Sequence, residues 1–137
     1  MTSWSIQSPS KEDSLDTKEQ SDKHIRQSIH YFENAMKNIE AGDPEKASEF
    51  LWGSVAQALK ALAASKGISL LSHNRIKSYA RELAKTQQDE TIWHAFDHAQ
   101  ALHSNFYETG LLLDDVAMSA DEVRAFLGKL FGMLPKE

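Results

Sequence analysis

The sequence predicts an all-α protein, an antiparallel up-down bundle of four to five helices. Three observations support this fold class. Apolar residues recur at steps of three and four along most of the 137-residue chain. Gly and Pro separate these periodic segments, as in short connections between neighbouring helices. No segment shows a convincing alternation of apolar and polar residues, which a half-buried strand would show.

The first helix is expected from about Thr17 to Ala41. Its apolar stripe consists of Ile25, Ile29, Phe32, Met36 and Ile39, and its opposite face carries Arg26, His30, Glu33 and Lys37. Residues 1–16 are rich in Ser and charge without a period, so we expect a mobile tail there and a single domain over residues 17–134. Gly42-Asp43-Pro44 is a short connection and predicts an antiparallel hairpin.

The segment from Asp43 to Gly67 is predicted to be the central helix. Asp43 can cap it, Pro44 suits its first turn and Gly67 is a natural end. Apolar residues cover most of the helical wheel: Ala47, Leu51, Trp52, Val55, Ala58, Leu59, Leu62 and Ala63. The polar remainder is narrow and consists of Lys46, Glu49, Gly53, Gln57 and Lys60. Such a helix must be covered by neighbours on most sides.

Three more segments complete the expected bundle. After an apolar connector at residues 68–71, Ser72 can cap a third helix, roughly His73 to Gln87, with Ile76, Ala80 and Leu83 inward. A fourth helix is expected from about Asp89 to Thr109, with an inward side of Ile92, Ala95, Phe96, Ala99, Leu102 and Phe106. Residues 111–116 are expected to be an apolar crossing. Ser119 and Glu122 fit a capping box that opens a final helix carrying Val123, Phe126, Leu127, Leu130 and Phe131.

Composition restricts the classes of function. The net charge of −5 disfavours indiscriminate nucleic-acid binding, although a local basic stripe could still bind phosphates. No cysteine is present, which excludes disulfides and thiolate metal sites and fits a cytoplasmic protein. No apolar run approaches the roughly 20 residues of a membrane span, and no secretory signal is visible. We therefore expect no membrane association.

His103 is the most suggestive single residue. It falls on the apolar side of the fourth helix, where an imidazole needs a hydrogen-bond partner. One interpretation is a core histidine; the other is a pocket histidine with Asn105, Tyr107 and Glu108 nearby in the chain. These side chains are the candidates for catalysis or binding.

His94 and His98 lie four residues apart, a spacing that can chelate a metal. A metal site needs further ligands, and no HExxH pattern is present. We expect a polar helix edge or an interface in place of a metal site.

The third helix carries a basic row of Lys77, Arg81 and Lys85, preceded by Asn74. Such cations can contact phosphates, by charge for Lys and bidentately for Arg. The alternative is a solvated helix face, because no aromatic residues are interleaved with the row.

Two stretches resemble a known superfamily. The run from Glu45 to Gly67, with Lys60, Ala61 and Leu62 before the glycine and His73 at the next helix start, resembles the HEPN superfamily of small helical bundles. Residues 101–110, ALHSNFYETG, resemble the PaREP branch, archaeal repeat-element proteins usually placed in that superfamily. The resemblance spans about residues 24–131 and implies a HEPN-like bundle, often a homodimer.

The resemblance also implies functions. Many relatives are RNA-cleaving toxins or partners of nucleotidyltransferases in toxin–antitoxin pairs, and the cleaving members share an Arg followed four to six residues later by His. No arginine precedes His94, His98 or His103 at that distance, and Arg26 and His30 have only three residues between them and lie in the first helix, not late in the domain. We therefore expect a cofactor-free module that binds a nucleotide, RNA or a protein, with candidate ligand-binding residues Lys60, His73, Lys77, Arg81, His98 and Tyr107. The alternatives are a metal-independent ribonuclease using His103 as acid/base, and a purely structural interaction module.

Overall fold

The computed structural model describes the backbone of residues 11–109 and 112–136, and the side chains of residues 17–104 and 112–136. Within these ranges the chain forms helices and no strand. The helices are α1 (Lys11–Glu40), α2 (Pro44–Ala64), α3 (His73–Thr86), α4 (Glu90–Thr109) and α5 (Leu113–Gly132). The all-α fold class predicted from the periodicity is confirmed.

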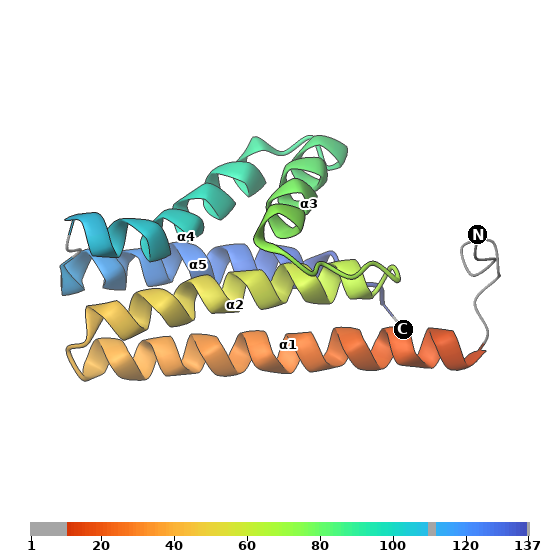
Figure 1. The fold of residues 1–137 in the computed structure, drawn as a ribbon, viewed down its shortest axis with the longest axis horizontal. Helices are drawn as coiled ribbons and strands as arrows, with labels where there is room; N and C mark the ends of the chain where they lie inside the picture. The colour runs from red at the N-terminus through yellow and green to blue at the C-terminus, as the bar shows by residue number, and fades with distance from the viewer. Residues whose placement is uncertain (1–10, 110–111, 137) are drawn as a thin grey trace.

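Four of the helices form an up-down bundle and α3 lies outside it (Figure 1). Helices α1, α2 and α5 run side by side along the long axis, while α4 starts away from them and converges on α5 at its far end. Helix α3 crosses between α2 and α4 and packs on these two helices alone among the described elements. It therefore occupies the connection between two antiparallel members of the bundle.

Helix α2 is the centre of the structure, as its wide apolar arc predicted. It packs against each of the other four described helices. Its largest fully buried side chains are Leu51, Val55, Leu59 and Leu62, and these meet Phe96 and Ile92 of α4 in one continuous core. Asp43 caps the helix by accepting a hydrogen bond from the Lys46 amide, 3.1 Å away, and Pro44 stands at its start.

Small residues line the seam between α1 and α2. The Ser21 hydroxyl donates to the Ala61 carbonyl oxygen at 2.9 Å, and the Ser28 hydroxyl donates to the Ser54 carbonyl oxygen at 2.7 Å. From the first pair to the second, the position on α1 moves forward by seven residues and the position on α2 moves back by seven, as expected for antiparallel helices. One further step of seven places Ala35 of α1 opposite Ala47 of α2. All of these residues are buried, so the two backbones approach closely along two-turn steps.

This seam corrects the stripe predicted for the first helix. Ile25, Phe32, Met36 and Ile39 are only half-buried, and Ile29 is 45% exposed. The large apolar side chains flank the contact line, because a close helix approach leaves room for Ser and Ala alone at its centre. The helix also begins at Lys11 and not near Thr17. Residues 1–10, part of the expected tail, lie outside the described residues.

The expected apolar crossing at residues 111–116 is also wrong in its described part. Helix α5 begins at Leu113, so Ser119 and Glu122 lie in its interior and form no capping box. Leu112 precedes the helix in an extended conformation and gives no side-chain cap. Asp114 and Asp115 stand in the first turn, where their charges favour the positive end of the helix dipole.

Three helices end with a residue of positive φ. Gly42 after α1 (φ 75°) and Gly67 after α2 (φ 77°) are the expected glycines, and Gln88 after α3 has φ 52°. In each case the next amide donates to a carbonyl five residues back, for example from Asp89 to Ala84 at 2.9 Å. The Gln88 turn positions the start of α4 beside the end of α3.

Candidate functional site

An open groove of about 990 Å³ lies at the corner between α3 and α4. The end of α3, the Gln88 turn and the first turn of α4 supply its walls: Arg81, Ala84, Lys85, Gln88, Asp89, Glu90, Thr91, Trp93 and His94. The groove exists because α3 leaves the bundle and returns through a three-residue turn. Its size is in the range of small-ligand sites in proteins.

Trp93 contributes an aromatic surface to this groove. Its ring stacks on Phe96, with centroids 5.6 Å apart and planes 29° apart, and Phe96 is fully buried in the core. The guanidinium carbon of Arg81 lies 4.9 Å from the Trp93 ring centroid, in a cation–π contact. The order from the core outward is therefore Phe96, Trp93 and Arg81.

Three basic side chains from two helices meet at the groove. Arg81 and Lys85 are exposed and lie one turn apart on α3, and His94 is exposed on α4. Glu90 stands in the first turn of α4, where its charge favours the helix dipole. This arrangement can bind an anion that also presents an apolar or aromatic face.

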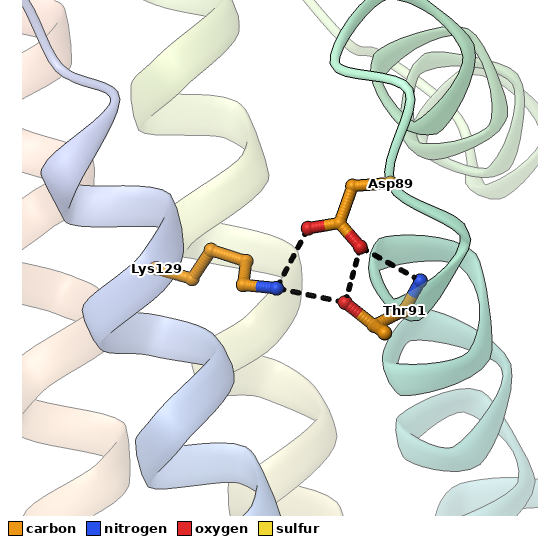
Figure 2. A network of polar contacts seen from close by, with 3 residues as sticks. All are labelled: Asp89, Thr91 and Lys129. Carbon is orange, nitrogen blue, oxygen red and sulfur yellow. Dashed lines mark hydrogen bonds and ion pairs between the residues drawn. The ribbon is translucent and has the colours of Figure 1, made fainter.

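The negative charge of Asp89 is balanced by α5. Lys129 Nζ donates to Asp89 Oδ2 and to Thr91 Oγ1, both at 2.7 Å (Figure 2). Asp89 Oδ1 accepts from the Thr91 amide at 3.0 Å and from the Thr91 hydroxyl, so it caps α4. The hydrogen bonds from Lys129 and from the Thr91 hydroxyl lower the pKa of Asp89 to about 2. The network ties the α3–α4 corner to α5 and leaves Asp89 already paired.

The other end of α3 rests on a second aromatic contact. The His73 ring lies 5.3 Å from Trp52 of α2, and its Nε2 donates to Gln100 Oε1 at 2.7 Å. Trp52 in turn meets the edge of Phe96 at 5.7 Å. His73, predicted as a ligand-binding residue, is therefore held in a contact that positions α3.

The other predicted site residues do not gather at one place. His103 is exposed, contrary to its expected inward position, because the buried line of α4 steps from Ala99 to Leu102 and leaves His103 further round the helix. Lys60 and Lys77 are half-buried on α2 and α3. The side chains of the remaining candidates, Asn105, Tyr107 and Glu108, lie outside the described residues. Of the predicted catalytic and ligand-binding residues whose side chains the structure describes, only Arg81 lines the α3–α4 groove.

His98 lies in a separate pocket of about 300 Å³ between α4 and α5. Its Nε2 is 2.9 Å from the hydroxyl of the buried Ser119 and 3.6 Å from Glu122 Oε2. A catalytic triad needs the hydroxyl and the carboxylate on opposite ring nitrogens, and here both face the same nitrogen. This trio therefore acts as a bridge between α4 and α5.

Nor do the two histidines of the predicted metal-like spacing share a site, because His94 lines the groove and His98 the second pocket. In the part of the chain that the structure describes, no three metal-ligating side chains of His, Cys, Asp or Glu converge.

Sequence reasoning missed the aromatic partner of the basic row. We expected no interleaved aromatic residue, because none occurs within the third helix itself at the needed spacing. The structure supplies Trp93 from the next helix. The signal was present in the sequence as a Trp in the first turn of the fourth helix, on the side of the wheel next to Phe96.

Comparisons with known proteins give the family. A search of curated proteins and a search of solved structures each returned no match. Among the described helices none is both long and apolar enough to cross a membrane. The model of the archaeal PaREP1/PaREP8 family matches residues 23–127, which include all of α2, α3 and α4. By this match over most of its length, the chain belongs to the archaeal PaREP1/PaREP8 family.

Proposed function

We propose that the protein is a helical module that binds RNA or nucleotides at the α3–α4 groove. The observation that carries the proposal is the convergence of Arg81 and Lys85 with Trp93 in one open groove. Cations attract phosphates, and an aromatic ring offers a surface for a base. A surface row that only kept the helix solvated would need no aromatic residue beneath it.

The distribution of charge supports the same ligand. Residues 73–86 contain four basic residues and one acidic residue, whereas the whole chain has a net charge of −5. A polyanion is repelled by the acidic remainder and attracted to α3, so binding is directed to one face. Pairing with Lys129 also reduces the repulsion from Asp89 at the groove.

The test is binding of a labelled RNA oligonucleotide, followed by fluorescence anisotropy at several salt concentrations. Replacing both Arg81 and Lys85 by Gln should weaken binding at least roughly tenfold at low salt. It should also flatten the dependence of log K on log salt by up to about 1.4, since each lost phosphate contact on a single strand removes about 0.7. Unchanged affinity and slope would contradict the proposal.

The matched control is the double replacement of Lys23 and Lys37 by Gln. Both residues are exposed on α1, which packs against neither α3 nor α4 in the described structure. The control removes the same formal charge and should leave affinity and salt slope nearly unchanged. Equal weakening by both double variants would indicate an effect of net charge alone. Thermal unfolding of each variant checks that the fold is retained.

The same RNA distinguishes the ribonuclease alternative. That alternative assigns acid/base catalysis to His103 and needs a cation to stabilise charge on the phosphoryl group. Gel analysis after incubation should recover intact RNA if the protein is a binding module. Cleavage that is lost in a folded His103→Ala variant would favour the ribonuclease.

A homodimer and a nucleotidyltransferase-type partner, both implied by the resemblance, belong to this proposal. Two exposed apolar side chains near the start of α5, Leu112 and Met118, support a protein contact at that end. Light scattering after size exclusion measures the mass directly. A single-chain mass at working concentration would remove the homodimer, and a dimer without RNA binding would favour the purely structural module.

A further inference from the structure

The aromatic surface in the groove is supported from behind. Trp93 is half-buried and stacks on Phe96, which is fully buried and also meets Trp52. A ring held in this way loses little freedom when a ligand stacks against it. The Arg81 guanidinium over Trp93 is planar and can itself stack on a base. The groove therefore presents a rigid stacking surface with a positive charge on it.

The remaining wall provides groups suited to a base edge. Gln88 lines the groove with an amide, which can donate and accept hydrogen bonds, and Glu90 lines it with a carboxylate, which accepts them. The positive φ of Gln88 sets the turn from which both residues project. Lys85 lies one turn beyond Arg81 on α3, so a charge for the backbone flanks the stacking surface.

A duplex cannot use such a surface. In a base-paired helix the faces of the bases are covered by their neighbours, and the protein meets mainly phosphates, sugars and groove edges. An unpaired nucleotide exposes both its face and its hydrogen-bonding edge. Phosphate contacts alone would require only Arg81 and Lys85, and would leave the Trp93 surface unused.

We infer that the groove takes an unpaired base of single-stranded RNA, stacked on the Arg81–Trp93 pair with its backbone phosphate at Lys85. This inference rests on the proposed function and narrows its ligand class. A nucleotide in a loop or at a frayed end satisfies it equally, because the shared chemistry is a base outside a stack with a phosphate beside it.

The first test compares three ligands on the unmodified protein: a single-stranded RNA decamer, the same decamer in a duplex, and an abasic strand with the same number of phosphates. A stacked base should make the single strand bind roughly 5- to 150-fold more tightly than the abasic strand. The duplex should bind no better than the abasic strand. Equal affinity for the single strand and the abasic strand would overturn the inference and leave the proposed function standing, whereas no binding of any strand would overturn both.

The second test separates the stacking of the planar Arg81 guanidinium from the effect of its charge. Arg81→Lys keeps the charge but removes the planar guanidinium from the Trp93 ring. It should weaken binding of the single-stranded decamer about tenfold and change binding of the abasic strand less than about twofold. The matched control is Arg75→Lys on the same helix, because Arg75 is exposed and does not line the groove. The stacking role would be contradicted if Arg81→Lys and Arg75→Lys weakened binding equally. It would also be contradicted if Arg81→Lys weakened binding of the single-stranded and the abasic strand by the same factor.

Discussion

At the scale of single residues, two buried serines differ in a way that makes a prediction. Ser28 donates its hydroxyl hydrogen to the Ser54 carbonyl oxygen, whereas the hydroxyl of Ser48 has no hydrogen-bond partner within the described structure. Both side chains are at most 1% exposed. Ser48→Ala should therefore raise the free energy of unfolding by about 1–2 kcal/mol, because it removes a desolvated hydroxyl. Ser28→Ala should lower it by about 0.5–1.5 kcal/mol.

Urea denaturation of the two variants measures the difference. Each substitution removes one oxygen from a buried helical position, so helix propensity and volume change equally in the pair. Opposite signs of the change in unfolding free energy are the expected result. If Ser48→Ala lowered the free energy of unfolding as much as Ser28→Ala, the Ser48 hydroxyl would contribute stability, contrary to the prediction.

Asp89 gives a prediction for pH. The hydrogen bonds from Lys129 and Thr91 lower its pKa from 3.8 to about 2, so the folded state binds this proton less readily than the unfolded state. The stabilising contribution is present above pH 3.8 and is lost as the pH falls from there toward 2. Asp89→Asn should lower stability at neutral pH and shrink the acid-induced loss in that window.

The measurement for Asp89 is the denaturation midpoint of both proteins between neutral pH and about pH 2, where the native contribution titrates. Because the Asn variant cannot titrate, the two curves should converge at the acid end. Parallel curves across the whole range would show that the Lys129 contact does not stabilise the corner. Lys129→Met, which removes the partner cation, should reproduce most of the effect.

At the scale of elements, the seam between α1 and α2 has little spare room. Ala35 is 0% exposed and lies in the same seven-residue series as Ser21 and Ser28. Ala35→Leu should cost about 1–3 kcal/mol or more, because extra methylenes in a filled contact force the backbones apart. Ile29→Ala on the same helix should cost clearly less, since Ile29 is 45% exposed.

Thermal unfolding with a matched pair of changes on α1 tests this ranking. A larger loss of stability from Ile29→Ala than from Ala35→Leu would contradict this ranking. It would indicate that α1 contacts its neighbours through the apolar stripe predicted from the sequence. The far-ultraviolet circular dichroism of both variants should remain helical, because α1 keeps its other contacts with α2 and α5.

The sequence was informative about helices and less so about the lines on which they meet. Period and end signals placed α2 and α3 nearly as they are, since Asp43, Gly67 and Ser72 act locally. The seam was missed because hydrophobicity points to Ile and Phe, while close packing selects Ser and Ala. The start of α5 was missed because Leu113 and its neighbours form a helical turn without a capping side chain.

The candidate groove could be predicted in part. Arg81 and Lys85 were visible as a row on one helix, because residues four apart lie on one face. The contact between Arg81 and Trp93 depends on the angle at which α4 leaves the Gln88 turn, and no local pattern sets that angle. The inward position expected for His103 was wrong for a related reason: a helical wheel of α4 alone cannot say whether neighbouring helices cover Ala99 and Leu102 or the next position round the helix.

At the scale of the whole molecule, stability should be distributed unevenly among the helices. Helix α2 packs against all the other described helices, whereas α3 packs on α2 and α4 alone. Native-state hydrogen exchange should therefore be slowest in α2 and faster in α3, since opening α3 exposes fewer buried side chains. Exchange in α3 as slow as in α2 would show that the two unfold as one unit.

The position of α3 has a consequence for the history of the family. Helix α3, with 14 residues, joins the helices α2 and α4 of the four-helix bundle, so its charge or length can change while the core of the bundle stays the same. Related chains are thus expected to diverge fastest there and to conserve the serine and alanine seam. Changes confined to α3 would alter the groove that it forms with α4 and leave the rest of the core in place.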